Sequence, residues 1–96
     1  KQVMSLDHSQ INNRLYLISS GALYENEPNV PYVWVYDATN LSYQKRLPIK
    51  KSKEYVSTDT SYIEPHYVFV NSNGSRIFVI TKEVEASEFK WAIQTL

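Results

Sequence analysis

His66 is the residue whose neighbours could give it a chemical role. Glu64 lies two residues before it, and Asp59 lies a few residues further back. A carboxylate can orient an imidazole and assist it in moving protons, which is the basis of general acid–base catalysis. The simpler interpretation is a polar connection between strands, in which neither carboxylate acts on His66. We therefore predict no catalytic residue and keep His66 and Glu64 as candidate binding residues.

Metal binding and thiol chemistry are disfavoured by the composition. The chain has no cysteine, which excludes disulfides, thiolate nucleophiles and cysteine-ligated zinc. The second histidine, His8, stands near a turn and is expected to be exposed. No residue has metal-ligand spacing to His66. We predict neither a metal site nor a cofactor.

Size and charge restrict the class of protein further. Ninety-six residues allow one domain with a modest core, and 43% hydrophobic with 21% charged residues is typical of a globular chain. Ten basic and ten acidic residues cancel, so a nucleic-acid partner is not expected. No apolar run approaches the roughly 20 residues that span a bilayer, and no leader peptide is visible. The compartment is left open, with an extracytoplasmic location slightly favoured.

Aromatic and β-branched residues dominate the apolar segments. Eight tyrosines, two tryptophans and three phenylalanines fall mostly among β-branched residues, so we predict an all-β fold. Asn and Asp residues that favour turns separate these runs. A helix over 84–96 is the main alternative for the C-terminal segment. The predicted strands are 2–9, 14–19, 32–37, 42–49, 66–70, 76–81 and 89–96.

Alternation within these strands predicts which side chains face the core. Val3 and Leu6 are core candidates in the first strand, and Trp91 and Ile93 point inward in the last. Pro48 cannot donate a hydrogen bond to a neighbouring strand, so its strand is expected at a sheet edge.

The chain contains an internal repeat. Residues 13–19, NRLYLIS, match residues 75–81, SRIFVIT, position by position in residue class. Residues 32–36, YVWVY, are echoed by residues 89–93, FKWAI, which puts the two tryptophans at matched core positions. A β-meander that repeats at roughly 60 residues is typical of β-propellers, whose blades are four-stranded antiparallel sheets.

The repeated segments resemble a known family. Residues 71–82, NSNGSRIFVITK, resemble the "SPDGKRLYVT" core of YVTN/lactonase-type β-propeller repeats. The preceding Pro65-His66 resembles the Pro-His that often opens the innermost strand of that repeat, and residues 33–49 resemble its other half. Asn73 stands where the family has Asp, and the first copy lacks both the Gly and the Pro-His. The resemblance implies a blade and places His66 near the mouth of a central channel.

The mapping onto blades divides the chain into three parts. Residues 1–50 form a first four-stranded blade, residues 51–64 form a polar linker, and residues 65–96 form three strands of a second, incomplete blade. Two blades cannot close a ring. The chain is therefore expected to be a fragment of a larger propeller, or a two-blade unit that neighbouring blades or other copies of the chain complete.

The predicted connections differ in length between the two ends of the blades. The long connections are 21–31, 50–64 and the acidic loop 82–87, whereas the other turns are tight. Loops on a rigid scaffold usually carry binding, so we expect function on the long-loop face. Tyr62 and Tyr24 in these loops join His66 and Glu64 as candidate binding residues.

Three functions are consistent with these features. The leading expectation is a non-enzymatic binding or scaffolding module that meets a protein or small-molecule ligand on its long-loop face. A propeller enzyme, such as a lactonase-like hydrolase or dehydrogenase with His66 lining the channel, is the first alternative. A structural repeat of a cell-surface protein is the second.

Overall fold

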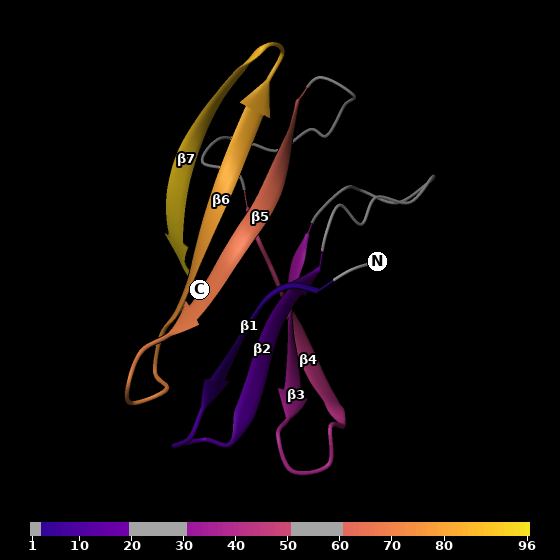
Figure 1. Cartoon of the computed structure of the whole chain (residues 1–96), viewed down its shortest axis with the longest axis vertical. Coiled ribbons are helices and arrows are strands. Elements are labelled where there is room, and N and C mark those ends of the chain that lie inside the picture. The colour runs from indigo at the N-terminus through magenta and orange to yellow at the C-terminus, as the bar shows by residue number, and fades with distance from the viewer. Residues whose placement is uncertain (1–2, 20–30, 51–60) are drawn as a thin grey trace.

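The described part of the molecule is built from β-strands alone. The computed structural model describes residues 3–19, 31–50 and 61–96 (Figure 1). The strands are β1 (Val3–Ser9), β2 (Arg14–Ser19), β3 (Tyr32–Asp37), β4 (Tyr43–Pro48), β5 (Ser61–Val70), β6 (Ile77–Glu85) and β7 (Glu88–Thr95).

These strands form two antiparallel meanders. The N-terminal sheet has the order β1-β2-β3-β4, and the C-terminal sheet has the order β5-β6-β7. The predicted all-β class with meander sheets is confirmed, and β4, which ends at Pro48, is an edge strand as expected. The helix alternative over 84–96 is wrong, because β7 occupies that segment. The described residues include no helix that could cross a membrane.

The β6–β7 hairpin is longer than the sequence pattern predicted. The expected acidic loop over 82–87 is wrong: β6 continues to Glu85, and only Ala86 and Ser87 separate it from β7. Opposite charges face each other at Glu83, whose Oε1 lies 3.7 Å from Lys90 Nζ, whereas Glu85 faces Glu88 beside the turn. Strand β5 likewise begins at Ser61, several residues before the expected start.

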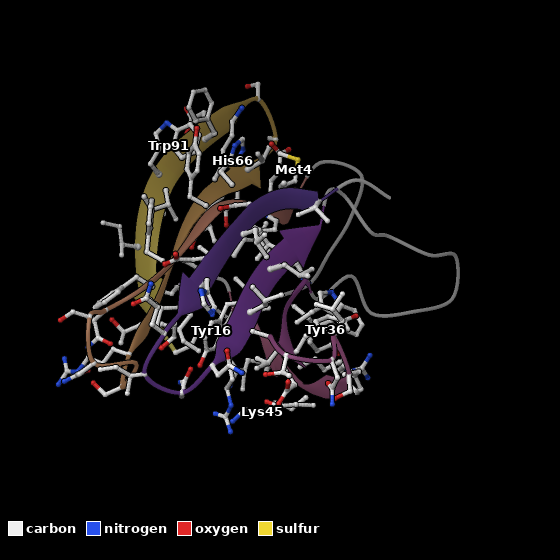
Figure 2. The ribbon with its side chains drawn as sticks, turned by 60° about the horizontal axis from the view of Figure 1, so that its bottom comes forward. Met4, Tyr16, Tyr36, Lys45, His66 and Trp91 are labelled. Carbon is white, nitrogen blue, oxygen red and sulfur yellow. The ribbon has the colours of Figure 1, made fainter. Side chains whose placement is uncertain are left out.

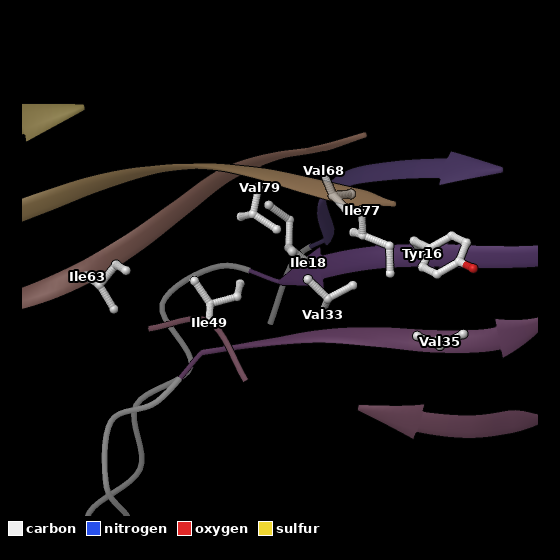
Figure 3. Close-up of a cluster of buried hydrophobic side chains, with 9 residues drawn as sticks. All are labelled: Tyr16, Ile18, Val33, Val35, Ile49, Ile63, Val68, Ile77 and Val79. Carbon is white, nitrogen blue, oxygen red and sulfur yellow. The ribbon is translucent and has the colours of Figure 1, made fainter. Parts of the chain in front are cut away.

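The core lies between the two sheets (Figure 3). Strands β1 and β2 lie against β5, so the sheets pack face to face and share one cluster. Each fully buried aliphatic side chain of this kind stabilises the fold by about 1.5–3 kcal/mol relative to exposure. The buried hydrophobic residues of the cluster are Tyr16, Ile18, Val33 and Val35 from the N-terminal sheet, Ile49 just after β4, and Ile63, Val68, Ile77 and Val79 from the C-terminal sheet.

Strand β1 contributes polar side chains to the interface between the sheets. The amide of Val68 donates to Ser5 Oγ at 3.2 Å, and the amide of Val70 donates to Asp7 Oδ2 at 2.7 Å. These amides belong to an edge strand and point away from β6, so the side chains satisfy donors that have no strand partner. Leu6 lies between the two polar residues and therefore faces outward.

Four predictions about the core are wrong. Val3 and Leu6 are exposed, because β1 turns Ser5 and Asp7 toward the other sheet. Trp91 and Ile93 are also exposed, because they pair with Lys82 and Ile80 on the face of the C-terminal sheet that points away from the core. Alternation identified one face of each strand correctly as apolar, but did not show which face the other sheet would cover.

The two sheets repeat the same irregularity at the same place. The β1–β2 ladder shifts register between Val3 and Ser5, and the β5–β6 ladder shifts between Pro65 and Tyr67. Met4 and His66 are therefore the extra residues of equivalent β-bulges.

The predicted match between the two tryptophans does not hold. Trp34 pairs with Leu17, whereas Val79, the counterpart of Leu17 in the repeat, pairs with Gln94. The counterpart of Trp34 is thus Gln94, three residues from Trp91. Side chains alternate between the two faces of a strand, so residues three positions apart lie on opposite faces. Trp91 therefore does not lie on the face of the C-terminal sheet that corresponds to the face of Trp34 in the N-terminal sheet.

The tight turns gather at one end of the molecule (Figure 1). The β1–β2 and β3–β4 turns touch where the Ala38 amide donates to Asn13 O at 2.9 Å. In the β3–β4 turn, Asp37 Oδ1 accepts the amides of Thr39 and Asn40, as its residue type predicted. The β6–β7 turn and the start of β5 lie at the opposite end.

Candidate functional site

The candidate site lies on the outward face of the C-terminal sheet, toward the end away from the tight turns (Figure 2). The ladder places Glu64, Lys82 and Trp91 side by side across the three strands, because Glu64 pairs with Lys82 and Lys82 pairs with Trp91. Phe89 and His66 adjoin this row. We call these five residues, Glu64, His66, Lys82, Phe89 and Trp91, the distal cluster.

The bulge in β5 aims His66 at this cluster. Pro65 is buried on the inward face, and the extra residue places both His66 and Tyr67 on the outward side. A bulge re-aims a side chain in this way and commonly occurs on edge strands, where proline is also tolerated. The Pro-His pair noted in the sequence therefore lies at the bulge, where the imidazole of His66 points toward β7.

His66 and Glu64 form a close pair. Glu64 Oε1 lies 2.7 Å from His66 Nε2, with the two side chains 37% and 23% exposed. An ionised carboxylate can only accept hydrogen bonds, so the imidazole must donate from Nε2. In the neutral ring this leaves Nδ1 as an acceptor, a position from which it could take a proton or a hydrogen bond from a ligand.

Aromatic rings surround this pair. The His66 ring meets Trp91 edge to face, with centroids 4.8 Å apart, and Phe89 meets Trp91 in the same manner at 6.4 Å. Lys82 Nζ lies 4.3 Å from the centroid of the Phe89 ring, within range of a cation–π interaction. The distal cluster thus combines one carboxylate, one imidazole and one ammonium group with two exposed aromatic rings.

The groups of the distal cluster can bind a ligand, and the carboxylate–imidazole pair can also move a proton. The described residues contain no group of three or more His, Cys, Asp or Glu side chains that could hold a metal ion. A His–carboxylate pair acts in covalent catalysis only together with a nucleophile that it can deprotonate. The rings in contact with His66 are those of Tyr67 and Trp91.

The structure brings together two of the four candidate residues. His66 and Glu64 are in contact, as their spacing suggested. Tyr62 lies in β5, where its backbone pairs with Val84, but its side chain is outside the described part of the structure, as is Tyr24 altogether. His8 is exposed, in agreement with the prediction.

Sequence reasoning missed the other members of the distal cluster. The sequence pattern predicts Trp91 in the core and Lys82 in a loop. The available signal was the alternation of Phe89, Lys90 and Trp91 opposite the charged end of β6, which is the pattern of a strand with one apolar and one charged face.

No family model, no curated protein and no solved structure matches this chain. The resemblance of residues 71–82 to YVTN/lactonase-type repeats therefore stays a prediction.

Proposed function

We propose that the chain is a non-enzymatic binding module of β-propeller type, whose two sheets correspond to successive blades. The proposal is supported by the two meanders, by their face-to-face packing and by the bulge repeated at Met4 and His66. In a larger array of blades, each repeated unit is expected to cover only one face of its neighbour.

The distal cluster is the proposed binding surface. The observation that carries this proposal is the His66–Glu64 pair, with Nε2 and Oε1 2.7 Å apart, beside Trp91, a residue that is 54% exposed. Exposed tryptophan beside oriented polar groups is typical of protein-binding hot spots, where the ring supplies buried area and the polar groups supply direction. Small-molecule sites are usually concave, so a protein or peptide partner suits this surface better.

A peptide-display selection tests the proposal. A library of random twelve-residue peptides is panned against the whole chain, and the dissociation constants of the selected peptides are measured by fluorescence anisotropy. Trp91→Ala and His66→Ala are expected to weaken binding at least about tenfold, since hot-spot truncations cost more than about 1.4 kcal/mol.

Phe69→Ala is the matched control. Phe69 is an exposed aromatic residue on the same face of β5, near the turn end. Its truncation should change affinity less than about threefold, because peripheral contacts contribute little. Selected peptides that lose as much affinity to Phe69→Ala as to Trp91→Ala, or a library that yields no specific binder, would contradict the proposal.

A hydrolytic enzyme is the second candidate, favoured only by the His66–Glu64 contact. On this alternative Nδ1 of His66 would act as a general base toward water. Hydrolysis of a chromogenic ester or lactone by the chain, abolished in both His66→Ala and Glu64→Gln, would favour the enzyme over the binding module. Hydrolysis that persists in these variants would exclude a role for the pair.

A further inference from the structure

The two faces that pack inside the molecule are of two different kinds. In the N-terminal sheet, the face with Tyr16 and Ile18 is buried. We call this face the leading face of the N-terminal sheet. The equivalent face of the C-terminal sheet carries Phe78 and Ile80, and we call it the leading face of that sheet. The opposite face carries Leu15 and Leu17 in the N-terminal sheet and Ile77 and Val79 in the C-terminal sheet, and we call it the trailing face.

These assignments rest on the ladders as well as on the repeated sequence. Both repeats start from a bulge, at Met4 and at His66, and every counterpart in the first two strands is separated by the same number of residues. Leu6 pairs with Leu17, and its counterpart Val68 pairs with Val79.

The interior of the molecule joins one leading face to one trailing face. The leading face of the N-terminal sheet packs on the trailing face of the C-terminal sheet. Within the part of the chain that the structure describes, the outward surfaces are therefore a trailing face on the N-terminal sheet and a leading face on the C-terminal sheet. The two outward faces are thus the equivalents, on the other sheet, of the two faces that pack together inside the molecule, and they lie on opposite sides.

Both outward faces carry apolar side chains at most of the positions whose counterparts are buried inside, and Thr95, the counterpart of Val35, is an exception. On the leading side, Val33 is fully buried, while its counterpart Ile93 is 70% exposed. On the trailing side, Val68 is 1% exposed, while its counterpart Leu6 is 55% exposed. Neighbouring exposed rings extend the outward leading face, namely Tyr67 and Phe69. Contiguous apolar surface of this kind commonly marks an interaction site.

We propose that these faces bind each other between copies of this chain. The outward leading face of one molecule docks on the outward trailing face of a second and repeats the internal arrangement of the sheets. Such a contact is heterologous, so it continues until the rotation between copies closes a ring or extends into a filament.

The polar groups at the edge are compatible with a second docking event. Inside the molecule, Asp7 Oδ2 accepts the amide of Val70, whose counterpart in β1 is His8. The His8 amide already donates to Asp7 Oδ1 at 2.9 Å within its own chain. Phe69 is the counterpart of Asp7 on the outward leading face. When β1 of a second molecule docks there, its His8 amide already has an acceptor, so no carboxylate is needed and the Phe69 ring can pack against β1.

The proposed contact adjoins the distal cluster on the same outward face, because Ile93 lies two residues from Trp91 and the Tyr67 ring lies 6.3 Å from that of His66. It is centred on Phe78, Ile80 and Ile93, nearer the tight turns, and does not rest on the binding function proposed above. Leu6→Asp is expected to weaken self-association from the opposite side of the molecule and leaves the distal cluster intact, so peptide binding and self-association can be measured independently in that variant.

The test uses the whole chain in two variants. Ile93→Asp places a charge on the outward leading face, and Leu6→Asp places one on the outward trailing face. Both residues are exposed, so each variant is expected to fold, which far-UV circular dichroism checks. Ile11→Asp, at an exposed position in the β1–β2 turn, is the control.

Sedimentation velocity over a hundredfold concentration range gives the assembly state. The wild-type chain and Ile11→Asp are expected to form concentration-dependent oligomers, and each face variant alone is expected to be a monomer or to associate at least tenfold more weakly. An equimolar mixture of the two variants should give a one-to-one dimer and nothing larger, because one intact leading face meets one intact trailing face.

Three results would overturn the proposal. The first is a wild-type chain that stays monomeric throughout the range, as expected if another protein covers these faces. The second is a face variant that dimerises alone as strongly as the wild type, which indicates a symmetric contact of one face with itself. The third is a mixture that contains no heterodimer. If Ile93→Asp does not fold, Phe69→Lys on the same face replaces it.

Discussion

At Gly74 the backbone conformation and the packing both exclude a side chain. Its φ is 72°, and a Cβ added there would lie 2.8 Å from Ser9 Oγ and 3.0 Å from Asn12 Nδ2. The β1–β2 and β5–β6 turns meet at this point. The glycine that the sequence pattern assigned to a tight turn therefore also holds the two sheets in contact at their turn ends.

Gly74→Ala is expected to destabilise the fold by roughly 1–2 kcal/mol, the usual cost of left-handed backbone for a residue with a Cβ. Urea unfolding measures the change. Ser72→Ala, in the same exposed turn, should alter stability by less than about 0.5 kcal/mol. Because Ser9 Oγ is buried without a hydrogen-bond partner among the described residues, Ser9→Ala should reduce the cost of Gly74→Ala. Equal costs in both backgrounds would show that the close approach does not matter.

At the scale of the element, the β6–β7 hairpin determines where the distal cluster lies. Its two-residue turn allows Glu85 to pair with Glu88, and the ladder then carries Phe89 and Trp91 alongside the charged end of β6. A six-residue acidic loop, as the sequence pattern predicted, would have left these rings elsewhere. Ala86 makes this turn with a φ of 53°.

Ala86→Gly is expected to stabilise the hairpin. Of the two central residues Ala86 alone has a positive φ, the pattern of a type II′ turn, which favours Gly at its first central position. The relief of backbone strain exceeds the added entropy of the unfolded chain, so we expect a gain of up to about 1 kcal/mol in thermal or urea unfolding. Ser87→Gly, where φ is negative, should be destabilising by about 0.5 kcal/mol. The opposite ranking of these two variants would contradict the turn assignment.

At the scale of the whole molecule, one core joins the two sheets. Val79 is fully buried in β6 and packs with residues of the N-terminal sheet, while Ile80 next to it faces outward. Neither sheet covers its apolar face without the other, so the two are expected to unfold together.

Val79→Ala should lower the stability of both sheets by about 1.5–3 kcal/mol, through lost burial and the cavity left behind. Trp34 and Trp91 provide one fluorescent probe in each sheet. In the Trp34→Phe and Trp91→Phe backgrounds, the remaining tryptophan should report the same urea midpoint, and Val79→Ala should shift both midpoints equally. Ile80→Ala at low protein concentration should have a smaller effect. Separate midpoints for the two tryptophans would mean that the sheets unfold independently.

The amino-acid sequence by itself determined most of the strands, the tight turns at one end of the molecule and the repeat of residues 13–19 at 75–81. Alternating β-branched and aromatic residues fix a period of two, and Asn, Asp and Gly place the turns, so β2, β3 and the β5–β6 hairpin could be predicted from local physics. The proximity of His66 to Glu64 also follows locally, from their spacing on one strand.

Only the tertiary structure decided which faces are buried and what surrounds His66. Both faces of β2 and β6 are apolar, so alternation could not tell which of them the other sheet would cover. In β7 the apolar face is clear from the sequence, but Ile93 on that face is exposed because no described part of the other sheet covers it. The bulge at His66 and the short turn at Ala86 bring Trp91 to the imidazole across three strands. Such contacts depend on pairing between residues distant in sequence, where a shift of one position reverses every side chain.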